Sequence, residues 1–341
     1  MLVVAYIGFG KSVRRYHIPY VESKENIKIK YVFRREEDRV GDEECEKAYP
    51  EIIFTTDFNQ VLNDPEVNLV VVNTPDRFHV SYAKQILNAG KNALVEKPFA
   101  MKAAEAREVF NLAKEKGLTV MANQNRRFDA DFQTVQKVLE TGKLGDIVEL
   151  ESHYDYFAPG GWGMGFDLLH GLAIHTIDQV ISLFGAPDHT VMDVRSLWDP
   201  GKADDYYDFD FFYGNRKAIV KTSQSVLIDY PRFTVHGTKG SFIVWPLPHQ
   251  SAAKDDPNAR VKISMEPQPK STWGLLRYIG EDGQRHDEEI PLEVQDYGKI
   301  YDNLYDVIFN GGEKIVKDEE VIIVLEIIEA ADQKVRSEGK K

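Results

Sequence analysis

The sequence predicts an α/β protein with two domains, a doubly wound parallel sheet followed by an α+β domain with a large, open, mostly antiparallel sheet. Its 341 residues exceed the ~250–300 residues at which a single hydrophobic core stops growing. Short apolar runs alternate with helical periodicity in the first third of the chain, and later strands alternate aromatic with acidic residues. We therefore predict domains at residues 1–122 and 123–341, and leave open whether the C-terminal helices return to the first domain.

Composition excludes several classes of protein. The chain has 42 Lys and Arg and 55 Asp and Glu, and the resulting net charge of −13 disfavours a nucleic-acid binder. No apolar run approaches the ~20 residues of a membrane span. The single cysteine, Cys45, permits no internal disulfide and no cysteine metal cluster, and the histidines lack metal-ligand spacing. No signal peptide is recognised. We expect a cytoplasmic protein that binds a small molecule, without metal, membrane or nucleic acid.

In the first domain, runs rich in Val, Ile and Leu predict strands buried on both faces of a parallel sheet. Helical periodicity that ends at a glycine predicts the helices between them, because glycine is the favoured residue just beyond a helix end. We expect strands at Leu2–Ile7, Ile27–Phe33, Leu69–Asn73, Ala93–Glu96 and Leu118–Ala122, and helices at Arg77–Ala89 and Lys102–Lys116.

In the second domain, period-2 patterns predict strands and 3.6-residue patterns predict helices. The predicted strands are Asp146–Phe157, Thr190–Ser196, Tyr207–Tyr213, Lys217–Ser223, Arg232–His236 and Ser241–Trp245, with further interrupted strands within 246–295. The predicted helices are Asp129–Thr141, Leu168–Phe184, Val294–Phe309 and Asp318–Arg336.

A glycine turn follows the first strand directly, in the order Ile7-Gly8-Phe9-Gly10-Lys11-Ser12-Val13. Glycines at this point allow a tight turn and let the backbone approach a pyrophosphate at the start of a helix. The third glycine of the dinucleotide fingerprint is replaced by Val13, so a glycine turn of an ordinary α/β domain stays an alternative.

The second strand ends in Val32-Phe33-Arg34-Arg35, without a carboxylate before Glu36. NAD-preferring folds usually place Asp or Glu here for the ribose 2′-hydroxyl, whereas a guanidinium pairs with a 2′-phosphate. The sequence therefore favours NADP(H), with NAD(H) possible. Arg34 is the expected main discriminator, with Ser12 or Arg35 helping; the alternative is two solvated arginines.

Together with the glycine turn, Asn73-Thr74-Pro75-Asp76 with His79 and Glu96-Lys97-Pro98 resemble the Gfo/Idh/MocA oxidoreductases. The resemblance implies a Rossmann domain, a C-terminal α/β domain, and homodimers or homotetramers formed through the open sheet. It also implies hydride transfer between a nicotinamide and a secondary alcohol or carbonyl of a sugar, polyol or sugar acid. We expect cofactor contacts from Gly8, Phe9, Gly10, Lys11, Ser12, Arg34, Arg35, Asn73, Thr74, Pro75, His79, Glu96 and Lys97.

Lys97 is the expected acid/base, because it follows a strand at the edge where open α/β sheets bind ligands. A cis peptide before Pro98 would aim it inward. His175 is the expected relay or hydroxyl ligand, although the acid that usually precedes it in the family is replaced by Gly171. The alternatives are a lysine paired with Glu96 and a buried structural histidine.

Substrate contacts are expected from Lys97, His175, Arg127, Tyr154 and Trp162. Aromatic faces pack on the C–H side of sugar rings, and a glycine-rich loop can close over a ligand. Tyrosines at alternating strand positions are alternatively core residues.

Two other functions compete with the dehydrogenase. One is a reductase of a non-sugar C=N or C=C bond. The other is a catalytically silent nucleotide-binding regulatory protein, which the loss of the acid at Gly171 would favour.

Overall fold

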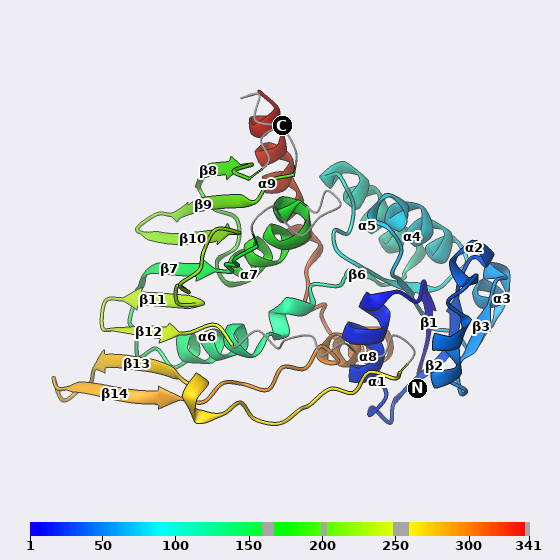
Figure 1. Ribbon diagram of the computed structural model, residues 1–341, viewed down its shortest axis with the longest axis horizontal. Helices are drawn as coiled ribbons and strands as arrows, with labels where there is room; N and C mark the ends of the chain where they lie inside the picture. The colour runs from blue at the N-terminus through cyan, green and yellow to red at the C-terminus, as the bar shows by residue number, and fades with distance from the viewer. Residues whose placement is uncertain (159–166, 199–202, 248–258, 338–341) are drawn as a thin grey trace. The chain divides into compact units, whose positions relative to one another are not determined.

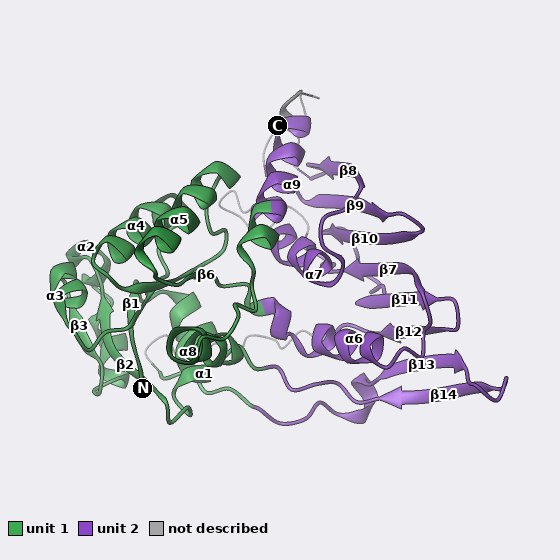
Figure 2. Cartoon of the chain, turned by 180° about the vertical axis from the view of Figure 1, so that it is seen from behind, with its two compact units in different colours: residues 1–125, 249–264, 296–322 green, residues 126–248, 265–295, 323–341 purple. Residues whose placement is uncertain are grey.

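The computed structural model describes residues 1–158, 167–198, 203–247 and 259–337 (Figure 1). Trp162 lies outside these ranges. The chain divides into two compact units, coloured separately in Figure 2. Unit 1 comprises residues 1–125, 249–264 and 296–322, and unit 2 comprises residues 126–248, 265–295 and 323–341.

Unit 1 is built on a six-stranded parallel sheet with the order β3-β2-β1-β4-β5-β6. Its strands are β1 (Leu2–Ile7), β2 (Ile27–Phe33), β3 (Ile53–Thr55), β4 (Leu69–Val72), β5 (Asn92–Val95) and β6 (Val120–Ala122). The order reverses between β1 and β4, which makes their carboxyl ends the topological switch point of the sheet.

The helical segments of unit 1 connect these strands, except the last, α8, which follows β14 in the chain. They are η1 (Val13–His17), α1 (Ile18–Val21), α2 (Glu36–Arg39), η2 (Glu43–Ala48), α3 (Phe58–Asn63), η3 (Asp76–Phe78), α4 (His79–Asn88), α5 (Ala103–Lys116) and α8 (Lys299–Asn310). A stretch at the boundary of the units, η4 (Asn125–Phe128), follows β6.

The expected doubly wound sheet is confirmed, and every residue of β4 is buried, as its unbroken apolar run predicts. β3 and α3 were not predicted. Three residues are too few to establish a period, and β3 joins the sheet only at its edge beside β2. The closing helix of this unit begins later than expected, at Lys299, because the Asp296 side chain accepts the backbone N–H of Gly298 in a turn before it.

Unit 2 is built on an eight-stranded sheet with the order β14-β13-β12-β11-β7-β10-β9-β8. β7 pairs with β10 in parallel and the other pairs are antiparallel. The strands are β7 (Ile147–His153), β8 (His189–Arg195), β9 (Tyr206–Tyr213), β10 (Arg216–Ser223), β11 (Phe233–Gly237), β12 (Gly240–Val244), β13 (Gly274–Ile279) and β14 (Arg285–Ile290).

One face of this sheet is covered and the other is exposed. α6 (Ala130–Glu140) packs against β11 and β12, and the helical run η5 (Leu169–Ala173) and α7 (Ile174–Phe184) reaches β10. Phe209 and Phe211 are fully buried on the covered face. On the opposite face Lys217 pairs with Asp210. This alternation confirms the antiparallel, one-sided sheet. Two further segments complete the unit, η6 (Lys270–Thr272) and α9 (Asp318–Ser337), whose first residues belong to unit 1.

The predicted strand from Asp146 to Phe157 is too long, since β7 ends at His153. The Asp155 carboxylate accepts the backbone N–H of Ser223 at 2.8 Å, a donor that a continuing strand ladder would use. Tyr154 therefore follows the strand instead of alternating along it.

None of the helices in the described ranges combines the length and apolar character needed to cross a membrane.

Candidate functional site

A cavity of about 350 Å³ opens in unit 1 at the carboxyl ends of β1, β2 and β4. This edge is the switch point of the sheet, where open α/β folds bind their ligands. The volume lies within the ~300–1,000 Å³ of small-molecule sites. Its walls are Ile7, Gly8, Phe9, Gly10, Phe33, Arg34, Arg35, Asp38, Asp42, Asn73, Thr74, Pro75, Phe78 and Tyr82.

The two glycines of the turn have different roles in shaping this cavity. Gly8 has a φ of +93°, and a Cβ added there would lie 2.6 Å from the backbone oxygen of Asn73. A side chain at Gly8 would therefore push the turn away from the end of β4. A Cβ at Gly10 would meet nothing within 4 Å, so this backbone is open to the cavity. Helical residues follow directly, from 11 to 21.

Two buried polar atoms on the cavity wall have no hydrogen-bond partner among the described residues, namely Oδ1 of Asn73 and Oγ1 of Thr74. Unpaired buried polar atoms are rare in proteins and point to a ligand. A nucleotide offers such polar groups, and the glycine turn offers backbone N–H groups to its phosphates. The residues of this cavity therefore fit a dinucleotide.

Near the glycine turn, the carboxylate of Glu96 forms hydrogen bonds with several elements of unit 1. Its Oε1 lies 2.7 Å from Nε2 of His17, 2.8 Å from Nδ2 of Asn123 and 3.0 Å from Oγ of Ser12. Its Oε2 accepts the backbone N–H of Lys97 at 3.1 Å. Glu96 thus joins the first helical segment to the ends of β5 and β6.

Electrostatics keep Glu96 ionised. Burial by itself would raise the pKa of this carboxyl, but the hydrogen bonds and charge of His17, the hydrogen bond from Asn123 and the charge of Lys97 lower it to about 2. The network continues inward, because Nδ1 of His17 lies 2.6 Å from the hydroxyl of Tyr301.

Lys97 follows Glu96 directly after β5, and the Lys97–Pro98 peptide is cis, as expected. The predicted cofactor residue His79 lies next to Pro98 and is fully buried. Its ring nitrogens lie 2.7 Å from the Pro98 oxygen and 2.8 Å from the Thr74 oxygen, so His79 joins the loops after β4 and β5. Five predicted cofactor residues do not line the 350 Å³ cavity: Lys11, Ser12, His79, Glu96 and Lys97.

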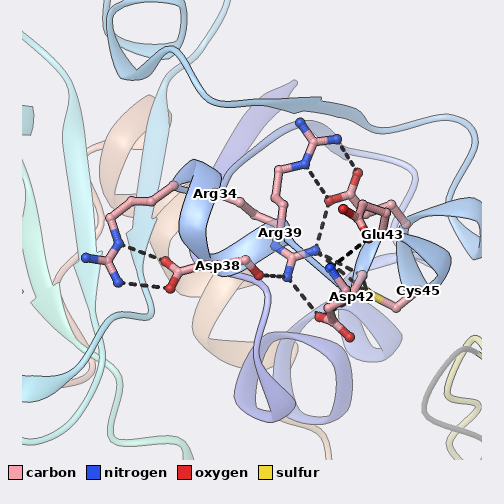
Figure 3. Close-up of polar contacts among 9 residues, drawn as sticks. Arg34, Asp38, Arg39, Asp42, Glu43 and Cys45 are labelled. Atoms are coloured by element: carbon pink, nitrogen blue, oxygen red, sulfur yellow. Dashed lines mark hydrogen bonds and ion pairs between the residues drawn. The ribbon is translucent and has the colours of Figure 1, made fainter.

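Arg34 lies on the cavity wall but is 5 % exposed. Its guanidinium donates to the carboxylates of Glu46 and Asp42, each at 2.8 Å, and to the backbone oxygen of Asp38 (Figure 3). Arg35 is more exposed and forms a two-bond pair with the Asp38 carboxylate at 2.8 and 2.9 Å. Neither arginine is simply solvated, since both already hold carboxylates.

In unit 2, Arg127 forms a buried two-bond ion pair with Asp178, at 2.7 and 2.6 Å. This pair fixes η4 to α7, the helix that carries His175. His175 is 5 % exposed and follows directly on the π-helical turns of η5, which include Gly171. π-Helical turns within α-helices are frequent at functional sites.

Tyr154 lies between two arginines of unit 2. The guanidinium carbons of Arg126 and Arg232 are 4.8 and 4.6 Å from the centre of its ring, and Arg126 donates to its hydroxyl at 2.5 Å. Arg232 also pairs with Asp131 at 3.3 Å. Tyr154 is therefore held by cations, which its position in the sequence did not predict.

His170 joins η5 to α9 within unit 2. Its Nδ1 lies 3.2 Å from Asp167 and its Nε2 lies 3.2 Å from Asp332. Burial would lower the pKa of His170, but the hydrogen bonds to the two carboxylates outweigh burial and raise it to about 10. His170 is thus a cation whose ion pair with Asp332 links η5, which leads into the helix of His175, to α9.

Sequence reasoning missed His17 and Tyr301 and left Asn123 unranked. The available signal for His17 was a histidine directly before the apolar run Ile18–Val21. No comparable signal existed for Tyr301, which meets His17 across 284 positions of the chain.

Sheet order and cavity together define a dinucleotide-binding protein of the Rossmann class. Comparison with known families agrees: residues 2–124 match the pattern described as "Oxidoreductase family, NAD-binding Rossmann fold". Residues 136–340 match "Oxidoreductase family, C-terminal alpha/beta domain". The chain belongs to the Gfo/Idh/MocA family of oxidoreductases.

Relatives match along nearly the whole chain. The oxidoreductase YhhX of Escherichia coli K12 is 48 % identical over 335 residues, which cover 95 % of this chain and 94 % of YhhX. IolW of Bacillus subtilis 168, named scyllo-inositol 2-dehydrogenase (NADP(+)), is 28 % identical over 96 % of this chain and 92 % of IolW. The crystal structure of an oxidoreductase from Bacillus cereus has a TM-score of 0.90 and 40 % identity, covering 97 % of this chain and 95 % of that chain.

Proposed function

We propose that this oxidoreductase transfers a hydride between NADP(H) and a secondary alcohol or carbonyl group of a sugar, polyol or sugar acid. The observation that carries the proposal is the cavity at the switch point, whose wall includes Asn73 and Thr74 with their unpaired buried side-chain oxygens. The name of IolW, an NADP(+)-dependent inositol dehydrogenase, supports both the cofactor and the substrate class.

The cofactor assignment relies on the residues at the cavity wall. The glycine turn at Gly8 and Gly10 receives the pyrophosphate, while Arg34 and Arg35 favour a 2′-phosphate over a 2′-hydroxyl. NAD(H) binds to the same wall more weakly in this proposal. Whichever dinucleotide is bound, its nicotinamide supplies the hydride chemistry.

Lys97 is the proposed acid/base. Its Nζ takes the proton of the substrate hydroxyl as the alcohol is oxidised and returns it on reduction. Glu96 supports this role, because its carboxylate holds the Lys97 backbone N–H at 3.1 Å. His175 is the proposed relay or hydroxyl ligand, with Arg127 fixing its helix through Asp178.

A substrate screen tests the proposal. The purified protein is incubated with NADP+ and, separately, NAD+ against a panel of polyols, sugars and sugar acids, and reduced cofactor is followed by its absorbance. Turnover of any member of the panel supports the proposal. A parallel assay follows the oxidation of NADPH with imines and activated alkenes. Turnover confined to that assay would instead establish the C=N or C=C reductase.

A second candidate is a silent nucleotide-binding regulator, favoured by Gly171 in place of the usual acid. It predicts cofactor binding without turnover of any panel member. Retention of both Lys97 and His175 favours the enzyme.

We also propose that the chain is cytoplasmic and forms a homodimer or homotetramer through the uncovered face of the unit 2 sheet. Val191, Leu275 and Ile279 are exposed on that face, next to charged residues such as Arg277. Light scattering of the purified protein tests the oligomeric state. If the uncovered face forms the interface, a charged substitution at Leu275 should release monomers.

A further inference from the structure

We propose that the carboxylate of Asp42 competes with a cofactor 2′-phosphate for the guanidinium of Arg34, and so limits how strongly the site prefers NADPH over NADH. This inference rests on the proposed function, because it concerns the same cavity. It identifies Asp42 as a residue that determines cofactor specificity by opposing the attraction of Arg34 for a 2′-phosphate.

Arg34 has little capacity left for a new anion. A guanidinium offers five N–H donors. In this chain those of Nη1 and Nη2 already reach Glu46 at 2.8 Å, the Asp42 carboxylate at 2.8 Å, the Asp42 backbone oxygen at 3.3 Å and the Asp38 backbone oxygen (Figure 3). A phosphate that pairs with these nitrogens must therefore displace one of their present acceptors.

Asp42 is the acceptor that can be displaced. Its side chain is 45 % exposed and lines the cavity, so a ligand reaches it. Glu46 is only 10 % exposed and is also held by Arg39, with bonds of 2.7 and 3.0 Å. Glu46 therefore keeps Arg34 in position while Asp42 gives way.

The exchange affects the two cofactors differently. A 2′-phosphate has to break the Asp42–Arg34 pair and then faces a carboxylate of its own sign. A 2′-hydroxyl carries no charge, so it leaves the pair intact and is not repelled by the carboxylate. Removal of the Asp42 charge should consequently strengthen the binding of the 2′-phosphate alone.

The test measures binding by calorimetry, without turnover. Wild type, Asp42→Asn and Asp42→Ser are titrated with adenosine 2′,5′-bisphosphate and with adenosine 5′-monophosphate, which differ only in the 2′-phosphate. Both variants should bind the bisphosphate about 3- to 10-fold more tightly than wild type, the range for loss of one half-exposed charge. Affinity for the monophosphate should change less than two-fold. Asp42→Ser keeps the test valid where Asp42→Asn fails to fold.

Glu44→Gln is the matched control. Glu44 lies on η2, which begins directly after Asp42; it pairs with Lys47 at 2.6 Å and does not line the cavity. This substitution changes the net charge by the same amount, so it should alter neither affinity more than two-fold.

Two results would overturn the inference in distinguishable ways. If the wild type binds the bisphosphate and the Asp42 variants bind it equally or more weakly, Asp42 orients Arg34 and does not compete. If neither ligand binds to the wild type or to any variant, the proposed cofactor site fails together with the inference.

Discussion

The carboxylate of Glu96 lies 2.7 Å from Nε2 of His17, so the end of β5 is tied to the helical segment that follows the glycine turn. The two residues are 79 positions apart in the chain. The same carboxylate oxygen accepts the hydroxyl of Ser12, two residues after the second glycine of the turn, at 3.0 Å, and Lys97 follows Glu96 directly. The ionised carboxylate of Glu96 therefore holds the elements on both sides of the glycine turn in place.

Glu96→Gln should show how much this contact stabilises the fold. The pKa of Glu96 falls from an ordinary 4.5 to about 2 in the folded chain, so its stabilisation is complete above pH 4.5 and is lost as the pH falls toward 2. We expect the variant to be about 3 kcal/mol less stable at pH 7, in urea denaturation. This gap should narrow below pH 4.5. An equal gap at pH 7 and pH 3 would contradict the assignment, and the exposed Glu115→Gln serves as control.

His170→Gln should have the opposite pH dependence. The pKa of His170 rises from 6.5 to about 10 in the folded chain, so its stabilisation is complete below pH 6.5 and disappears as the pH rises through 10. Melting curves of wild type and variant should differ most near pH 6 and converge by pH 10.5. His189→Gln, at an exposed position, should show no such convergence. A difference that grows with pH would disprove the cationic clamp.

Arg127→Met should cost about 3–5 kcal/mol of unfolding free energy, because it leaves the Asp178 carboxylate buried without its partner. The double variant Arg127→Met, Asp178→Leu should recover most of that loss, since neither charge then remains. Urea denaturation measures both. A single variant within 1 kcal/mol of wild type would show that the pair does not anchor α7.

Lys97→Met should lower kcat about 10²- to 10⁴-fold, which is the usual contribution of a general acid or base. Dinucleotide affinity, measured by fluorescence, should stay within a few-fold because the cavity wall is unchanged. Lys116→Met, at an exposed position near the end of α5, controls for the lost charge. Full activity of Lys97→Met would remove this residue from the mechanism.

Much of unit 1 could be predicted because its signals are local. β1 and β2 occupy the expected residues. Gly8 stands at the expected turn, where a φ of +93° favours glycine. A buried apolar run followed by a glycine carries this information within a few positions. β3 gave no comparable signal because it has three residues.

The candidate site was less predictable because its side chains meet partners from distant segments. Arg34 lies on the cavity wall, where its contact with a phosphate stays a prediction, and it also pairs with Asp42 and Glu46, partners that no rule of strand spacing selects. Arg127, whose expected contact with substrate stays a prediction, pairs with Asp178, 51 positions away. Trp162 lies outside the described residues, so its role stays a prediction.

The proposed function requires that the cavity at the switch point bind a nicotinamide dinucleotide and prefer NADPH. The most direct measurement is a fluorescence titration of the purified, cofactor-free protein with NADPH and with NADH at one salt concentration. We expect saturable binding of both cofactors, with NADPH bound more tightly than NADH. Tighter binding of NADH would contradict the role of Arg34, and no binding of either would contradict the cofactor site itself.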